Sequence, residues 1–431
     1  MKPTRAKRQL SPGQGDLFGL DQIFSIYQAT PDAAISNAEL YKRVSQKTGV
    51  SLSVIDERVP VGKSGEKHSI SRRAIRFRQQ DLKQQGILER VKGERGVWRL
   101  TEAAKRDLHA AKSGVKLLGF RTDLGIAVWG PSGDIFKKLH VPVTLVYSSP
   151  PYALRRPRAY GNPDEREIVD FICDTLEPVI EAMAEDASLV LNVSNDVFHA
   201  NSPARSTYVE RLTLEICDRF NPMWLMDRLI WENPSKMPGP MQWCSRTRQQ
   251  LQVSWEPLLW FARNPLKVKS DNRRVLEPHS ERHLKLMQAG GENRDTNYGD
   301  GAYRLKVGSF GTPTPGRIPN NIITRGHRCA HGSRYRKAAI ELGLPTHGAG
   351  QPYSVPEFLI KFLTEEGDLV VDPFSGRGMT SLAAELNNRA WMSGEINLEY
   401  IRSGAELFRG RPGFWLNPQI ERAFRAGREE C

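Results

Sequence analysis

The chain has 431 residues, 39% hydrophobic and 26% charged, which describes an ordinary globular protein with room for two or three domains. It lacks any run of about 18 apolar residues, which excludes a membrane-spanning helix, and its five scattered cysteines favour a reducing cytoplasm over a disulfide framework. The formal net charge of +13 predicts a polyanionic partner.

The N-terminal quarter is predicted to be a small helical domain. Residues 1–15 are basic and polar and are interpreted as a flexible arm. Apolar spacing and capping residues then predict three helices, over 21–29, from Ser36-Asn37 onward, and over 70–85. On the third helix, Ile75 and Leu82 are expected to face the core.

A basic hairpin is expected to close this domain. Strands 87–91 and 97–100 flank a glycine turn, and a last helix is expected from Thr101. Residues 16–112 therefore follow a winged-helix pattern and resemble the N-terminal domain of Mrr-type restriction proteins. The resemblance implies DNA binding by the third helix through Arg72, Arg73 and Arg76, although the same arginines also fit a solvated helix face.

Residues 113–262 are predicted to begin an α/β domain. A strand and a turn are expected over 115–139, and the buried strand 143–147 must end at Ser148-Ser149-Pro150-Pro151-Tyr152, because prolines cannot continue a sheet ladder. Open α/β sheets bind ligands at the carboxyl edge of their strands. The Ser149 hydroxyl and the carbonyls of Ser149 and Pro150 are acceptors there, and Tyr152 is a stacking face, which together suit an amino group on a planar heterocycle. The alternative is an ordinary proline-rich turn.

The rest of this half alternates helix and strand. A helix is expected to open at Asn162-Pro163. Its core stripe is predicted to be Ile168, Phe171, Ile172, Leu176, Val179 and Ile180. Strands are expected over 189–193, 229–234 and 254–261.

Residues 263–345 lose this periodicity and are interpreted as an insert. The part from 263 to 337 carries 16 Lys and Arg against 6 Asp and Glu. Ordering on DNA is favoured over a flexible charged loop, because a structureless loop of this length is uncommon inside a domain. Arg273 and Arg274 are the candidate DNA contacts. The spacing of His327, Cys329 and His331 fits no standard zinc pattern, so no metal site is predicted.

Residues 346–431 are predicted to bind a nucleotide-like cofactor. A leader at 350–356 and a helix precede the strand that ends at Asp372, and a glycine turn follows. Gly376 and Gly378 would let the backbone approach a ligand closely. Glu395 ends the next strand 23 residues after Asp372, the spacing of a ribose-binding acid.

The two motifs together resemble those of the amino-group DNA methyltransferases, Ser/Asp/Asn-Pro-Pro-Tyr/Phe and Asp-Pro-Phe-x-Gly-x-Gly-Thr. They lie about 220 residues apart with the catalytic motif first, which is the order of the family's β class. The resemblance covers 117–262 and 346–410. It implies a Rossmann-like α/β methyltransferase fold with circularly permuted motifs, in which the insert is a target-recognition region and Asn233-Pro234 lines the target-base side.

The resemblance also assigns roles to residues. S-adenosylmethionine (AdoMet) would be held by a set spread over the cofactor motif and the earlier strand: Asp372, Pro373, Phe374, Gly376, Gly378, Thr380, Glu395 and, at the adenine, Asp134. Another register would put Pro131 at the adenine. Met379 stands where the family usually has a first threonine. Arg377 is unusual in the family and is a candidate for a phosphate contact.

Methyl transfer is expected to be a direct displacement on a base flipped out of duplex DNA, with Ser149, Pro150, Pro151 and Tyr152 as the catalytic loop. No Pro-Cys pair exists, which disfavours cytosine-C5 chemistry. The serine form of the motif favours cytosine N4, and adenine N6 is the alternative. An inactive DNA-binding regulator and an RNA or protein methyltransferase are more distant alternatives. The resemblance leaves room for a cognate restriction endonuclease, and the expected location is the prokaryotic cytoplasm at the nucleoid, in a host-encoded or phage-encoded protein.

Overall fold

A computed structural model describes residues 18, 20–30, 33–60, 66–84, 87–91, 93–101, 110–151, 167–199, 202–236, 239–299, 301, 303–347 and 350–424. The chain divides into two compact units, one built mainly on residues 1–109 and the other beginning at Ala110. The smaller unit has a hydrophobic core of its own, and the larger has two.

The smaller unit packs helices against a three-stranded sheet. Its elements are α1 (Leu20–Gln28), β1 (Ile35–Ser36), α2 (Asn37–Thr48), α3 (Leu52–Asp56), β2 (Arg58–Pro60), β3 (Lys67–Ser69), α4 (Ile70–Gln84), β4 (Leu88–Arg90) and β5 (Val97–Leu100). The sheet order is β1-β5-β4, and β2 and β3 form a separate hairpin. The three predicted helices and the β4–β5 hairpin are confirmed, with Ile75 and Leu82 fully buried. The sequence missed α3, β1 and the β2–β3 hairpin, and the helix predicted from Thr101 falls mostly outside the described residues.

The larger unit is built on a ten-stranded sheet with the order β14-β10-β11-β9-β8-β15-β16-β7-β6-β17. Its first elements are β6 (Leu117–Arg121), β7 (Gly125–Trp129), α6 (Ser132–Phe136), β8 (Val143–Ser148), α7 (Ile168–Glu181), β9 (Met183–Asn192), α8 (Tyr208–Arg219), β10 (Trp224–Glu232), the π-helix η1 (Met241–Arg246) and β11 (Trp255–Ala262). The later ones are α10 (Ala330–Glu341), of which residues 330–336 belong to this unit, α11 (Ser354–Leu363), β15 (Leu369–Asp372), α12 (Met379–Leu386), β16 (Ala390–Glu395), α13 (Leu398–Gly404), the 3₁₀ helix η3 (Ala405–Leu407), β17 (Trp415–Leu416) and α14 (Pro418–Ala423). Strands β9, β8, β15, β16 and β7 are mutually parallel, so their carboxyl ends share one edge.

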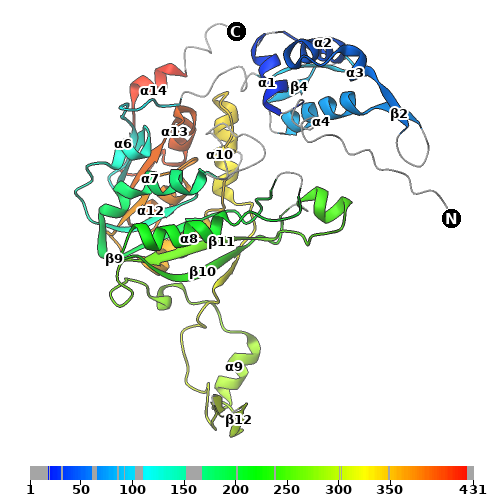
Figure 1. Cartoon of the computed structure of the whole chain (residues 1–431). Coiled ribbons are helices and arrows are strands. Elements are labelled where there is room, and N and C mark those ends of the chain that lie inside the picture. The colour runs from blue at the N-terminus through cyan, green and yellow to red at the C-terminus, as the bar shows by residue number, and fades with distance from the viewer. Residues whose placement is uncertain are drawn as a thin grey trace, which may run out of the picture. The chain divides into compact units, whose positions relative to one another are not determined.

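Helices cover both faces of this sheet (Figure 1). Successive residues of β15 point to opposite faces, so Val370 lies in one core with α11, α12 and α13, whereas Val371 lies in the other with α6, α7 and α8. The architecture is therefore a three-layer α/β/α sandwich with a mixed sheet, and the α/β class predicted from sequence is confirmed.

Several sequence predictions for this unit were incomplete or wrong. The segment 115–139 holds two strands and the helix α6, where one strand and a turn were expected, and α8 was not predicted. The predicted helix start at Asn162-Pro163 lies outside the described residues. Five of the six residues predicted for the core stripe of α7 are buried, but Phe171 is 39% exposed and the prediction for it was wrong.

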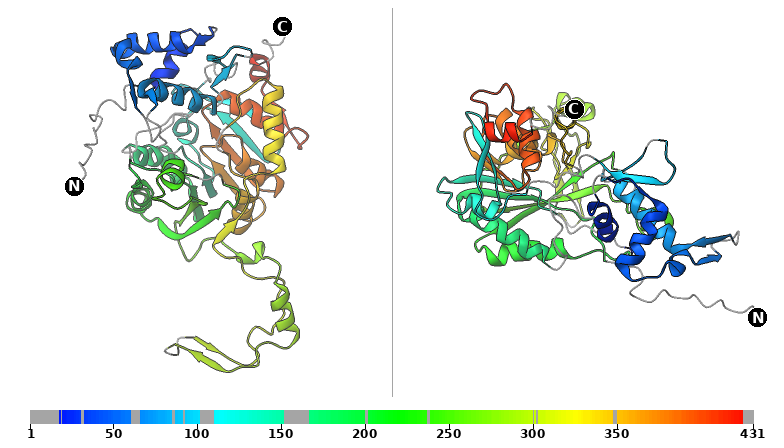
Figure 2. Two further views of the ribbon diagram at one scale, coloured as in Figure 1. Left: turned by 90° about the vertical axis from the view of Figure 1, so that its right-hand side faces the viewer. Right: turned by 90° about the horizontal axis from the view of Figure 1, so that it is seen from above.

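The predicted insert is not one separate segment. Its elements are the 3₁₀ helix η2 (Asn272–Val275), α9 (Glu281–Gln288), β12 (Thr296–Tyr298), β13 (Tyr303–Leu305) and β14 (Ile322–Thr324). β14 pairs with β10 and so belongs to the main sheet, and η2 packs against α11. The part with α9 and the β12–β13 hairpin extends away from the sheet in Figures 1 and 2.

Candidate functional site

The predicted catalytic loop begins where β8 ends. The strand runs to Ser148 and is followed by Ser149, Pro150 and Pro151, of which both prolines are buried and Ser149 is partly exposed. β8 lies between β9 and β15, and this places the loop at the shared carboxyl edge. The loop position predicted from sequence is therefore observed, whereas Tyr152 lies outside the described residues.

Ser148 joins the catalytic strand to the predicted cofactor motif. Its Oγ donates to Asp372 Oδ1 at 2.5 Å, and the Phe374 N–H donates to the same Oδ1 at 3.1 Å. The Thr380 side chain is also hydrogen-bonded to Asp372. Sequence reasoning passed over Ser148, and the available signal was a hydroxyl inside an otherwise apolar buried strand.

The loop between β15 and α12 turns at the two glycines of the predicted cofactor motif. Gly376 and Gly378 have φ of 51° and 77°, in the left-handed region that other residues rarely adopt. The Gly376 N–H donates to Glu395 Oε2 at 2.7 Å, and the Asn397 N–H donates to Oε1 at 2.8 Å. Glu395 at the end of β16 therefore holds the loop that follows the neighbouring strand.

Asp372 and Glu395 are buried carboxyls with abnormal acidity. Burial raises the pKa of Asp372 to about 6, against hydrogen bonds from Ser148, Thr380 and the Phe374 N–H that lower it. Burial likewise raises the pKa of Glu395 to about 7, and the charge of Asp372 adds to this. Among the described residues neither carboxyl has a cationic partner within salt-bridge distance. A cationic ligand would favour the ionised form of both, so this site fits a sulfonium-bearing cofactor.

Two phenylalanine rings lie on the same side of the glycine loop. Phe374 follows Asp372, and its ring centroid is 6.1 Å from that of Phe171 on α7, with the planes tilted by 44°. Phe171 is therefore an apolar residue of α7 that lies partly exposed beside Phe374 of the predicted cofactor motif, although its helical spacing suggested the core. Helical periodicity cannot separate these two uses of an apolar side chain.

The helix α6 reaches the cofactor motif through a residue that was not predicted. The Ser132 hydroxyl donates to the Pro373 carbonyl. Asp134, the residue predicted near the adenine, instead accepts a hydrogen bond from the Gly114 N–H at 2.8 Å. Its contact with the cofactor stays a prediction.

Polar side chains gather on the other side of the catalytic loop. Ser148 pairs with Leu191, so Asn192 ends β9 beside the loop. Asn192 Nδ2 and Lys236 Nζ each lie 3.3 Å from a different oxygen of Glu256. Asn233 is buried and accepts from Ser235. Asn233 is the member of this polar group that the resemblance expects on the target-base side, and its contact with a base stays a prediction.

The arginines predicted to bind DNA differ in how far they are engaged. Arg72 pairs with Asp56 at 2.6 Å and lies over the Tyr41 ring, whereas Arg73 and Arg76 of α4 are exposed. Arg273 is paired with Asp271, but its side chain is 84% exposed.

Arg274 is the least suited of these to a DNA contact. It donates to the carbonyls of Thr364 and Lys269 and helps to hold η2 against α11. The geometry therefore favours Arg273 over Arg274.

Arg377 does not support the predicted phosphate contact. Its side chain is only 9% exposed and donates to the Gln351 carbonyl, so a DNA phosphate cannot reach it without rearrangement. That interpretation was wrong, because the sequence does not show that the leader 350–356 covers this side chain.

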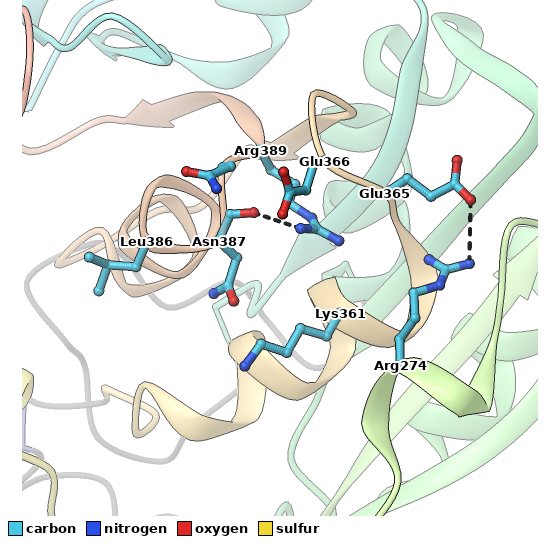
Figure 3. A pocket seen from close by; sticks show the side chains of 8 residues that line it. Arg274, Lys361, Glu365, Glu366, Leu386, Asn387 and Arg389 are labelled. Carbon is cyan, nitrogen blue, oxygen red and sulfur yellow. Dashed lines mark hydrogen bonds and ion pairs between the residues drawn. The ribbon is translucent and has the colours of Figure 1, made fainter. Parts of the chain in front are cut away.

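A charged pocket lies at the opposite, amino edge of β15 and β16 (Figure 3). It is lined by Arg274, Lys361, Glu365, Glu366, Leu386, Asn387, Asn388 and Arg389. Within the described ranges no cluster of three His, Cys, Asp or Glu side chains could hold a metal, and no helix is long and apolar enough to cross a membrane.

Comparison with known proteins bears mainly on the larger unit. Residues 143–406 match a family model described as DNA methylase. The type II methyltransferase M.PvuII of Proteus hauseri is 31% identical over 266 residues, 62% of this chain and 78% of that protein. M.BglII of Bacillus subtilis is 24% identical over 279 residues, 63% of this chain and 64% of that protein. The solved structure of a PvuII DNA methyltransferase (cytosine-N4-specific) has a TM-score of 0.53 and 26% identity, covering 70% of this chain and 92% of that one.

Proposed function

Because the chain belongs to the DNA methylase family, we propose that it methylates the exocyclic N4 of a flipped cytosine at a specific site in duplex DNA. The observation that carries the proposal is the Ser149-Pro150-Pro151 loop on β8, directly beside the Asp372 motif on β15. Its similarity to M.PvuII and to a cytosine-N4-specific structure supports N4 as the acceptor.

AdoMet is the methyl donor of this family, and it supplies an electrophilic methyl group on a sulfonium. The residues present fit it. Asp372 and Glu395 are buried acids that a cation would keep ionised, Glu395 ends β16 where a ribose is bound in nucleotide-binding sheets, and Phe374 offers an apolar face. Gly376 and Gly378 keep the loop free of side chains that would block a ligand.

On the acceptor side, the protein's task is to make a poor nucleophile reactive. The lone pair of a cytosine amino group is delocalised into the ring. The Ser149 hydroxyl and the Pro150 carbonyl would accept its two N–H groups and turn the nitrogen toward tetrahedral geometry. Tyr152 would stack on the base after it leaves the duplex. Catalysis then rests on positioning and electrostatics, without a covalent enzyme intermediate.

The identity of the base is tested on the product. DNA methylated by the purified protein is digested to nucleosides, which are separated by mass spectrometry. N4-methylcytosine is expected. N6-methyladenine would replace the base assignment but keep the loop chemistry, and 5-methylcytosine would overturn both. AdoMet binding without any methylated nucleoside would identify an inactive DNA-binding regulator.

DNA recognition is proposed to use two further regions. The helices and the β4–β5 hairpin of the smaller unit support a winged helix that presents Arg73 and Arg76 of α4. The part of the insert with α9 and the β12–β13 hairpin would read the target sequence. Motif order along the chain supports a circularly permuted methyltransferase, since β8 precedes β15 in sequence and neighbours it in the sheet.

Salt dependence separates these two regions. Each phosphate contact that is lost should reduce the slope of log affinity against log salt by about 0.9. We expect this from Arg73→Ala and Arg76→Ala, with site preference retained. Deleting α9 to β13 should abolish site preference and leave AdoMet binding intact. A deletion that kept the preference would assign recognition to the smaller unit. A cognate nuclease and association with the nucleoid stay predictions.

A further inference from the structure

Arg377 is a buried cation in the middle of the glycine loop. Its side chain packs against Gly350, where a built Cβ would overlap the guanidinium carbon, so a side chain at that position would displace Arg377. One guanidinium nitrogen donates to the Gln351 carbonyl, while Nε is buried and has no hydrogen-bond partner. The segment 350–351 thus forms a close-fitting cover over a charge that is only partly satisfied.

No acidic side chain in the described part of the chain pairs with this charge. The largest electrostatic influences on Arg377 come from Cys329, Tyr335 and Arg336, and none of these is a carboxylate. A buried charge without a counter-charge costs several kcal/mol, and such a charge persists in a fold where a bound anion offsets it. The arrangement therefore points to an anionic ligand.

The position of Arg377 indicates which anion. Glu395 and Asp372 end the neighbouring strands β16 and β15, and Ser149 follows β8, the next strand of the sheet. A cofactor with its ribose at Glu395 and its methyl group facing the Ser149 loop must lay the rest of its methionyl chain near the loop after β15. Arg377 belongs to that loop. Gln351, which accepts from the Tyr147 hydroxyl of β8, covers it on the side of the catalytic strand.

We propose that Arg377 recognises the methionyl carboxylate of AdoMet, in a site that Gly350 keeps open for the guanidinium. This rests on AdoMet as the methyl donor and not on which base is methylated. Segment 350–351 must move aside for any anion to reach this buried side chain, and the terminal carboxylate of AdoMet needs a smaller opening than a phosphate within a DNA backbone. A competing explanation for the buried arginine is that it interacts with the Cys329 thiol. The Cys329 Sγ accepts from the Gly332 and Tyr353 N–H groups, and both Sγ and the guanidinium lie next to Gly332.

The first test needs only the native full-length protein. Decarboxylated AdoMet keeps the sulfonium, the ribose and the amino group, and lacks only the carboxylate. By calorimetry it should bind about 10- to 100-fold more weakly than AdoMet, the effect of losing one or two charge-assisted hydrogen bonds. Equal affinities for the two ligands would overturn the proposal, whatever the outcome of the product analysis.

The second test uses variants and the same two ligands. Arg377→Met should bind both with similar affinity, near that of the native protein for decarboxylated AdoMet. Gly350→Ala should lose discrimination in the same way, although the arginine is still present. Arg377→Lys should retain part of it. The matched control is Arg389→Met, which removes another buried arginine from the opposite edge of the sheet and should leave discrimination unchanged.

Two results would contradict the role of Arg377. One is native discrimination in Arg377→Met, with folding verified by its thermal transition. The other is a change in the alkylation rate of Cys329 in Arg377→Met without any loss of discrimination, because the arginine would then serve the thiol. Neither readout depends on methyl transfer, so an inactive protein and a wrong ligand assignment remain distinguishable.

Discussion

The two edges of the central sheet carry charged groups that are compensated in opposite ways. At the carboxyl edge, Asp372, Glu395 and Arg377 are each at least nine-tenths buried, and the described residues offer none of them an ion-pair partner. At the amino edge, Arg389 is also buried, yet it donates to the Thr364 hydroxyl, the Thr364 carbonyl and the Asn387 carbonyl. Asp372 and Glu395 accept hydrogen bonds from their neighbours, so the clearest difference between the edges is Arg377, whose buried Nε has no hydrogen-bond partner. We interpret Arg377 as a charge left for a ligand, whereas Arg389 holds the fold together.

The pocket of Figure 3 illustrates the second case. Arg274 binds backbone carbonyls and lies 3.9 Å from Glu365, and Lys361 pairs with Glu357 at 2.8 Å. A concave surface with charges of both signs looks like a binding site, but most of its charges already have partners within the protein. The two edges therefore differ in whether their charged side chains have partners within the protein, and a concave surface alone does not identify a binding site.

The largest expected effect tests the carboxyl edge. Ser149→Ala removes one acceptor for the amino group and leaves the cofactor pocket unchanged. Methyl transfer should fall about 10²- to 10³-fold, as on losing one preorganised catalytic hydrogen bond. Single-turnover transfer of a labelled methyl group measures this, and calorimetry should find native affinity for AdoMet.

Ser148→Ala is the matched control one residue earlier. Its hydroxyl donates to Asp372, so its loss should further disfavour the ionised carboxyl and weaken AdoMet binding. If both serine variants lost the same affinity for AdoMet, the proposal that Ser149 acts on the base and Ser148 on the cofactor site would be refuted.

The carboxyl edge is also the part of the molecule most open to prediction from sequence. Prolines and glycines impose special backbone conformations, so their positions alone locate the Ser149-Pro150-Pro151 loop and the turn at Gly376 and Gly378. The contact of Ser132 with Pro373 and the exposure of Phe171 were missed, because both arise from how α6 and α7 pack. β14 was missed for a similar reason, since three residues carry too little pattern to reveal a strand paired far away in sequence.

The next largest effect sets the two buried arginines against each other. Arg389→Met leaves the Asn387 carbonyl without its donor, whereas the Thr364 carbonyl keeps Arg274 as a donor. The variant should cost about 1–3 kcal/mol of unfolding free energy for the acceptor left unsatisfied. Arg377→Met removes an uncompensated charge but also leaves the Gln351 carbonyl without its donor, so the two effects should offset and the variant should be nearly neutral without AdoMet. Urea denaturation without ligand compares them. If Arg377→Met lost more unfolding free energy than Arg389→Met, Arg377 would be the arginine that stabilises the fold, and our interpretation of the two edges would be wrong.

A smaller effect follows from the raised pKa values of Asp372 and Glu395. Between about pH 4 and pH 7 the folded protein binds more protons at these groups than the unfolded chain does, so their contribution to stability falls as the pH rises. AdoMet affinity should change in the opposite sense and increase between about pH 6 and pH 8, because the cation favours both ionised carboxylates. Glu395→Gln should flatten both profiles, and native slopes in that variant would show that Glu395 does not titrate in this range.

The smallest effect concerns Phe171, the apolar residue of α7 that does not face the core. If its ring and that of Phe374 form one wall of the cofactor pocket, Phe171→Ala should weaken AdoMet binding by about 0.5–1.5 kcal/mol, the usual worth of an aromatic contact. Since the side chain is 39% exposed, its loss should cost far less stability than truncation of its buried neighbour Ile172. Ile172→Ala is therefore the control, with lower stability and native affinity where it remains folded. If Phe171→Ala lowered stability but bound AdoMet with native affinity, Phe171 would contribute to packing of the core and not to the cofactor pocket.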